Sequence, residues 1–187
     1  MTDALNLTNH FLIAMPTLKD ANFFHSVTLI CEHNEEGTIG ILINRPLDIG
    51  LGEILNQMDI ENDDSDVKQQ HVYLGGPVQN ERGFIIHKPH GDEEETLIIS
   101  DNLAVSSSRE MLISIVANKG PEKTLVALGY AGWTAGQLEK ELAENAWIST
   151  PASEDIIFDT PDAERWKAAA ASAGVDLSRL SSDVGHA

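Results

Sequence analysis

Apolar residues in this chain gather in short runs that are typical of β-strands. Residues 27–31 and 38–43 are rich in β-branched side chains and flank a turn-like segment that ends at Gly37, so we predict two strands joined by a loop. Both runs are apolar at consecutive positions, which indicates central strands covered on both faces. Shorter runs of the same kind predict further strands at 11–15, 72–74, 83–87, 96–100, 124–129 and 155–158.

Helices are predicted from capping signals. Ser107-Ser-Arg-Glu110 is a capping box ahead of an apolar-periodic stretch, and Thr134-Ala-Gly-Gln137 is a second one. Thr160-Pro161 places an N-cap and an N1 proline before an alanine-rich helix, and a shorter helix is expected at 54–58. Strands and helices are interspersed without a regular βαβ rhythm. We therefore predict the α+β class: a single compact domain over residues 1–187, with a mixed, mostly antiparallel β-sheet flanked by about four helices.

The chain is strongly acidic, with 30 Asp and Glu against 12 Lys and Arg and a formal charge of −18. Such a field repels phosphate backbones, because binding to them depends on neutralisation by Lys and Arg. The basic residues are scattered along the chain and form no cluster. We therefore expect no direct contact with nucleic acid, and the plain interpretation of the charge is solubility.

Nothing in the sequence predicts export or membrane insertion. The region before Lys19 has no basic residue, and the apolar run at 11–15 is too short for a signal peptide. No apolar stretch approaches the length of a membrane helix. The single cysteine, Cys31, cannot form an internal disulfide and is typical of a reducing compartment. The expectation is a cytoplasmic protein that does not associate with a membrane.

Common catalytic and metal-binding motifs are absent. The sequence has no GxxxxGK[ST] or GxGxxG phosphate loop, no GxSxG elbow, no HExxH and no paired CxxC. The acidic segment 59–70 has carboxylates at calcium-loop spacing but lacks the turn glycine and the bidentate Glu. Pro89, between His87 and His90, prevents the helical geometry that would align these two on a metal. We predict no cofactor and no metal site, and we assign no catalytic residue.

Three predicted strands end in residues with special chemistry. Gly75-Gly76-Pro77 follows one strand, Asn44-Arg45 closes a second, and Gly129-Tyr130-Ala-Gly-Trp133 extends a third. Glycines can expose backbone N–H groups, and the proline after Arg45 favours an extended arginine whose guanidinium can clamp a carboxylate or phosphate. If the strand ends lie side by side, they form one binding surface, for which we name Asn44, Arg45, Gly75, Gly76, Pro77, Tyr130 and Trp133.

Each of these features also has a purely structural interpretation. In that case the glycines form a tight turn, Arg45 pairs with an acidic residue, and Tyr130 and Trp133 close the core. Cys31 and His33 present a similar choice, because they lie two apart on a predicted strand and hence on one face. They form either a thiolate–imidazole pair or, as the apolar neighbours favour, a buried structural cysteine near a histidine.

A series of short motifs follows one order along almost the whole chain: 10–16 (HFLIAMP), 26–27, 31–33, 40–46 (GILINRP), 73–77 (YLGGP), 82–84, 127–131 (ALGYA), 136–139 (GQLE), 145–147 and 185–187. This ordered series resembles the AlgH/YqgE family of uncharacterised bacterial proteins. The resemblance implies one compact α+β domain around a mixed sheet, in the bacterial cytoplasm. One member's name links it to the regulation of alginate synthesis, but the family has no recognised DNA-binding motif. Where related chains often have a basic residue in the first loop, this chain has His25, so an anion-binding role there would depend on pH.

Our leading hypothesis is a non-enzymatic regulatory or interaction protein that binds a protein partner or a small anionic ligand at the glycine-ended strand termini. Any effect on transcription would be indirect. The alternative is an enzyme acting on a small anionic substrate clamped by Arg45, with amides near Gly75 and Gly76 stabilising charge and His33 or His87 carrying the proton. This alternative requires one of the two histidines within a few ångströms of Arg45. The sequence leaves the ligand, the partner and the oligomeric state open.

Overall fold

The structure is a computed structural model and describes residues 5–61, 65–89 and 96–184. The described strands form a ten-stranded sheet whose main path runs β10-β1-β2-β3-β9-β6-β8-β7, with β5 joining β4 to β9. Among these strands only β5 and β9 pair in parallel, so the predicted mixed, mostly antiparallel sheet is confirmed. The strands are β1 (His10–Ala14), β2 (Val27–Asn34), β3 (Gly37–Leu42), β4 (Pro46–Gly50), β5 (His71–Leu74), β6 (Val78–His87), β7 (Thr96–Ile98), β8 (Ala104–Ser106), β9 (Thr124–Thr134) and β10 (Trp147–Pro151).

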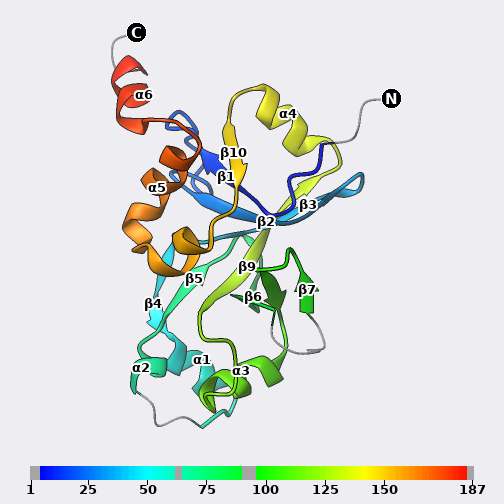
Figure 1. Ribbon diagram of the computed structural model, residues 1–187, viewed down its shortest axis with the longest axis vertical. Coiled ribbons are helices and arrows are strands. Elements are labelled where there is room, and N and C mark those ends of the chain that lie inside the picture. Colours follow the sequence, from blue (N-terminus) through cyan, green and yellow to red (C-terminus); the bar gives the residue numbers. More distant parts are fainter. Residues whose placement is uncertain (1–4, 62–64, 90–95, 185–187) are drawn as a thin grey trace.

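The helices gather at the two ends of the sheet, as Figure 1 shows, with α1 to α3 at one end and α4 to α6 at the other. Ser108 caps α3 by accepting a hydrogen bond from the Met111 N–H at 3.2 Å, one residue later than the capping box predicted. The α+β class is confirmed. The helices are α1 (Leu51–Gln57), α2 (Ser65–Lys68), α3 (Arg109–Val116), α4 (Gln137–Ala143), α5 (Arg165–Ser172) and α6 (Leu177–Val184), with a π-helix at Asp155–Asp159 and a 3₁₀ turn at Asp162–Glu164.

β9 is the longest strand and connects two parts of the sheet (Figure 1). Its residues 124–128 pair with β5 and β6, Tyr130 pairs with Val78 of β6, and residues 131–134 pair with β3. Gly129 lies between the two segments and has a φ of +80°, a left-handed conformation that glycine adopts without a Cβ penalty. The strand therefore changes from β6 to β3 two residues after Gly129, which interrupts regular β geometry.

The central strands are covered on both faces, as their continuous apolar runs predicted. Phe11 and Leu29 belong to a cluster that also contains Ala169 of α5. Their chain neighbours Leu12 and Ile30 face the other way, into a second cluster with Trp133, Trp147 and Leu138 of α4. A third cluster, around α1 and α3, covers the opposite end of β9.

The prediction of a strand at 155–158 was wrong. This segment is a π-helix, and its Ile156 and Ile157 are both buried in the first cluster. A short apolar run is compatible with a strand or with a buried helical turn, and packing against the sheet decided between them. Strands β4, β8 and β10 were not predicted, because their sequences have too few consecutive apolar residues to stand out.

Candidate functional site

The glycine-marked strand ends meet in space, at the point where the chain leaves β5 and crosses β9. The Gly75 N–H donates to the Leu128 carbonyl at 2.7 Å, and the Gly75 carbonyl accepts from the Leu42 N–H at 2.8 Å. A Cβ atom added at Gly76 would overlap the Tyr130 carbonyl, and one at Gly75 would overlap the Gly129 carbonyl. Both residues are buried, whereas Pro77 is exposed. The glycines thus allow two backbones to touch, and the Gly75 amide is engaged within the sheet.

Asn44 and Arg45 hold the loop before β2. The Asn44 side chain accepts from the Val27 N–H at 3.0 Å and donates to the His25 carbonyl at 2.9 Å. The Arg45 guanidinium donates to the carbonyl of Ala21 at 2.9 Å and to that of Phe24. Partial burial lowers the pKa of Arg45, and the nearby Asp20 opposes that shift. The two side chains therefore bind backbone in this structure.

Tyr130 and Trp133 lie on opposite faces of β9. Tyr130 packs against the first core cluster, with its ring edge-to-face against Phe84 at a centroid distance of 6.0 Å. Trp133 is buried in the second cluster, stacks on Phe23 at 5.7 Å and donates its indole N–H to Glu141 at 3.3 Å. The two aromatic rings therefore do not form one surface, because residues three apart on a strand face opposite ways.

The prediction that Cys31 and His33 share a face was wrong. A β-bulge between Ile30 and Glu32 inserts an extra residue into β2 and reverses the alternation after it. Cys31 lies in the first core cluster, whereas the His33 ring bonds to Glu139 of α4 on the other side. A thiolate–imidazole pair therefore does not form.

The histidines of the enzyme hypothesis have their ring nitrogens engaged away from the loop that Arg45 holds. His33 Nδ1 accepts from the Leu7 N–H at 3.0 Å, and its Nε2 lies 2.5 Å from Glu139 Oε1. His87 is fully buried, with Nδ1 2.5 Å from the Lys88 carbonyl and Nε2 2.6 Å from Ser106 Oγ. These contacts give no support to a proton carrier beside Arg45.

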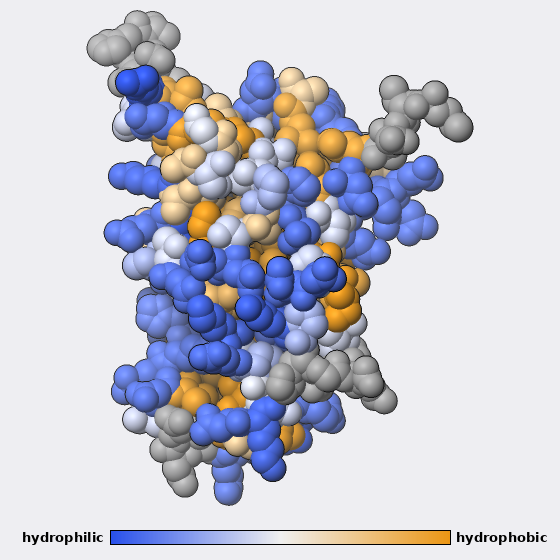
Figure 2. Space-filling model, viewed as in Figure 1, coloured by the Kyte–Doolittle hydropathy of each residue, from blue (hydrophilic) through white to orange (hydrophobic). Residues whose placement is uncertain are grey.

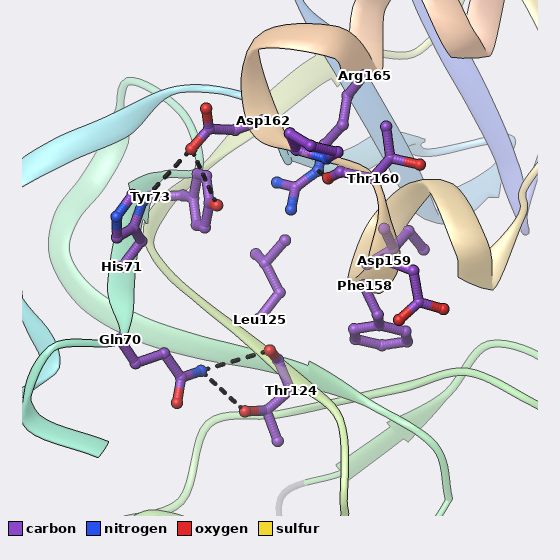
Figure 3. Close-up of a pocket in the computed structure, with 12 residues that line it drawn as sticks. Gln70, His71, Tyr73, Thr124, Leu125, Phe158, Asp159, Thr160, Asp162 and Arg165 are labelled. Atoms are coloured by element: carbon purple, nitrogen blue, oxygen red, sulfur yellow. Dashed lines mark hydrogen bonds and ion pairs between the residues drawn. The ribbon is translucent and has the colours of Figure 1, made fainter. Parts of the chain in front are cut away.

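A different site emerges where β5, the start of β9 and residues 157–165 enclose a hollow of about 500 Å³ (Figure 3). We call it the Arg165 cleft. His71 and Tyr73 reach it from β5, since they lie two apart on the strand and hence share a face. Asp162 and Arg165 reach it from the 3₁₀ turn and the first turn of α5. A hollow of this volume is within the range that accommodates small molecules.

Arg165 is the most unusual residue of the cleft, because it is a buried cation. Only 6% of the residue is exposed, and Figure 3 shows its guanidinium directed toward Tyr73 and Leu125. Its Nε donates to the Thr160 carbonyl at 2.9 Å and its Nη1 to the Ile43 carbonyl. No carboxylate within the described parts of the chain forms an ion pair with it. Buried charges are ordinarily paired, so a buried arginine whose hydrogen-bond partners are backbone carbonyls is unusual.

Tyr73 and Asp162 form a polar wall beside this cation. The Tyr73 ring lies under the guanidinium, and the distance from the ring centroid to Arg165 Cζ is 5.0 Å. The Tyr73 hydroxyl donates a hydrogen bond to Asp162 Oδ2 at 3.3 Å. His71 Nδ1 lies 3.4 Å from the same oxygen. Burial raises the pKa of Tyr73, while the nearby charge of Arg165 acts in the opposite direction. The phenol is therefore a neutral hydrogen-bonding group.

The rest of the cleft is held by paired polar groups and a π-helix. The Gln70 amide donates to Thr124 Oγ1 at 3.0 Å, and Lys123 bridges both oxygens of Asp159 at 2.8 Å. Phe158 lines the cleft from the π-helix Asp155–Asp159. Helices of this type are rare and are frequent at functional sites.

None of the seven residues predicted for binding lines the Arg165 cleft. A signal for part of it was present, because Tyr73 lies on the predicted strand 72–74, His71 directly precedes that strand, and Thr160-Pro161 is a predicted helix start. The burial of Arg165 had no such signal, because its carbonyl partners Thr160 and Ile43 depend on tertiary packing.

A second hollow, of about 750 Å³, is mainly apolar and is lined by Tyr130, Phe84, Ile39 and Leu97, with Arg82 as its cation. Figure 2 shows hydrophobic surface at β7, one of several hydrophobic areas on this face. Within the described ranges, no three His, Cys, Asp or Glu residues lie together as a metal site would require. None of the described helices has the length and apolar character needed to span a membrane.

The chain matches the model of the AlgH-like family, DUF179, over residues 11–178. It is 56% identical over 179 residues to a UPF0301 protein of Nitrosococcus oceani, and the match covers 96% of each chain. It is 54% identical over 187 residues to a UPF0301 protein of Thioalkalivibrio sulfidiphilus, with both chains covered completely.

Solved structures agree with this assignment. The solution structure of the AlgH protein from Pseudomonas aeruginosa has a TM-score of 0.80 and 46% identity, covering 97% of this chain and 96% of that one. A crystal structure of a Corynebacterium diphtheriae protein has a TM-score of 0.71 at 19% identity, covering 90% and 87%, and shows likeness of fold alone. Family model, relatives and fold lead to one conclusion: the chain belongs to the AlgH-like family.

Proposed function

We propose that this protein is a non-catalytic regulatory protein of the bacterial cytoplasm that binds a small anionic ligand in the Arg165 cleft. The observation that carries the proposal is the buried Arg165 cation, which faces a hollow and has no carboxylate partner among the described residues. A buried guanidinium is costly unless its charge is matched, so an anion that enters the cleft gains a strong and directional contact.

The regulatory part of the proposal rests on the family and on charge. The name of one AlgH relative links it to the control of alginate synthesis, and a ligand-responsive protein fits such a role. With a formal charge of −18, the chain would act on transcription indirectly, through a protein partner. The single cysteine is consistent with the cytoplasm.

Thermal unfolding in the presence of small carboxylates and inorganic phosphate tests the ligand. A probe at one hundred times its Kd stabilises the fold by about 2.7 kcal/mol, which corresponds to roughly 5–10 °C in Tm for a chain of this length. The shift should disappear in Arg165→Gln and persist in Arg179→Gln, which changes an exposed arginine of α6.

Native mass spectrometry of protein purified from its own host completes the test. A bound small molecule that is retained by the unmodified protein and lost from Arg165→Gln supports the proposal. If no probe raises Tm and no molecule is bound, the proposal fails. Circular dichroism must show that Arg165→Gln is folded, because the side chain also ties α5 to the Ile43 carbonyl.

A further inference from the structure

We propose that the ligand of the Arg165 cleft is a small zwitterion, an α-amino acid with an apolar side chain. Its carboxylate would bind Arg165, its ammonium would bind Asp162, and its side chain would lie on the apolar floor of the cleft. This inference rests on the proposed function and names the chemical class of the ligand.

Arg165 retains the donors that a carboxylate needs. A guanidinium has five N–H donors. Two donate to the carbonyls of Thr160 and Ile43, and the guanidinium carbon lies 5.0 Å from the centroid of the Tyr73 ring. The other three N–H groups donate no hydrogen bond to the described residues, and a bidentate contact with one carboxylate uses two.

Asp162 provides the opposite charge on the same cleft. Its side chain is 23% exposed, and Oδ2 meets only the Tyr73 hydroxyl and the mostly exposed His71 ring, at 3.3 and 3.4 Å. No Lys or Arg among the described residues lies within ion-pair distance of it. Its carboxylate is therefore able to accept from an ammonium group.

The two charges are kept apart, since no ion pair within 4.0 Å joins Asp162 to Arg165. The other carboxylate of the cleft, Asp159, is neutralised by Lys123. One cation and one carboxylate thus face the same hollow, and their fields favour a ligand with one charge of each sign. A polyanion such as a nucleotide would meet a single arginine within a chain of charge −18.

The floor of the cleft selects an apolar side chain. Leu125 and Ile157 are buried beneath it, and Phe158 is partly exposed on its wall. Figure 3 shows Leu125 between the charged residues on one side and Thr124 on the other. An amino acid with an aliphatic or aromatic side chain would cover the exposed part of Phe158 and remove that apolar area from water.

Isothermal titration calorimetry with a matched set of probes tests the inference. The set contains two amino acids, L-phenylalanine and L-leucine, and two single-charge analogues of phenylalanine. The analogue 3-phenylpropionate lacks the ammonium group, and phenethylamine lacks the carboxylate. We expect at least one of the amino acids to bind, and L-phenylalanine or L-leucine to bind at least about tenfold more tightly than either single-charge analogue. Asp162→Asn should abolish the difference between L-phenylalanine and 3-phenylpropionate, whereas Arg165→Lys should weaken both and Arg179→Gln neither.

The outcomes separate this inference from the proposed function. Equal affinity for 3-phenylpropionate and L-phenylalanine overturns the zwitterion but leaves an anionic ligand in place. Equal affinity for phenethylamine overturns both. If neither L-phenylalanine nor L-leucine gives a heat of binding, the inference is wrong. The proposed function is also wrong only if the small carboxylates and inorganic phosphate do not bind either. If Asp162→Asn weakens the binding of L-phenylalanine and of 3-phenylpropionate equally, Asp162 has a merely structural role and the inference is wrong. If that variant does not fold, the affinities of the four probes for the unmodified protein decide.

Discussion

His33 of β2 and Glu139 of α4 are joined by a short contact, with 2.5 Å between Nε2 and Oε1. The His33 side chain is 1% exposed, and its Nδ1 accepts the Leu7 N–H at 3.0 Å. Because Nδ1 is the acceptor, the ring proton lies on Nε2 and faces the carboxylate. One imidazole thereby connects the N-terminal segment, the sheet and α4.

The hydrogen bond from His33 lowers the pKa of Glu139 below its ordinary 4.5. A carboxylate with a lowered folded-state pKa stabilises the fold at pH values above 4.5, and this contribution is lost as pH falls through the folded-state pKa. We therefore expect Glu139→Gln to have a lower Tm than the unmodified protein near neutral pH, with the gap narrowing in acid. Thermal unfolding, followed by circular dichroism from acid to neutral pH, measures this difference in Tm between the variant and the unmodified protein. Glu144→Gln, at the exposed end of the same helix, is the control. A difference in Tm that stays constant with pH would contradict the claim that the ionised Glu139 carboxylate stabilises the fold through His33.

Gly76→Ala should be among the most damaging single changes in the protein. The new Cβ would overlap the Tyr130 carbonyl, and overlap with backbone cannot be relieved by a rotamer change. We expect a loss of about 3 kcal/mol or more in the free energy of unfolding, measured with urea. Gly132→Ala is the matched control on β9, because its Cβ meets only the Tyr130 ring at 3.7 Å. Similar stabilities for the two variants would refute the backbone-contact explanation.

Arg45→Ala should loosen the loop before β2 without affecting ligand binding. It removes two charge-assisted hydrogen bonds, to the carbonyls of Ala21 and Phe24. The expected cost is about 1–2 kcal/mol, together with faster proteolysis around residues 20–25. Ligand affinity in the Arg165 cleft should be unchanged. A variant of normal stability that loses the ligand would instead make Arg45 the binding residue.

Cys31 should be inert in the native protein. Burial raises the pKa of its thiol from 9.0 to about 12, which reduces the thiolate fraction near pH 8 roughly a thousandfold. We expect slow labelling by a disulfide reagent under native conditions and ordinary labelling in denaturant, measured by absorbance. Since the chain has no other cysteine, the signal has one source. Rapid native labelling would show that the thiol is accessible and ionised.

The sequence alone was informative wherever local chemistry determines local structure. The continuous apolar runs at 27–31 and 38–43 predicted the buried strands β2 and β3, since strands covered on both faces must be apolar on both. The helix predicted after the capping box at 134–137 is α4, although its N-cap is Gly136 and not Thr134, and the motif order predicted the family. The same local reasoning was wrong at 155–158 and across the bulge in β2. Packing selects a π-helix in the first case, and one inserted residue reverses the alternation of faces in the second.

The sequence by itself thus determined the class of the fold, the central strands, the acidic surface and the family. The tertiary structure decided which special residues serve packing and which face a cleft. Gly75 and Gly76 are glycines because a backbone crosses them, and Asn44 and Arg45 bind carbonyls that are distant in the sequence. Arg165 faces the cleft only because β5, β9 and the C-terminal segment converge there. Side-chain type and spacing specify local geometry, but burial and partner choice depend on contacts between segments far apart in the chain.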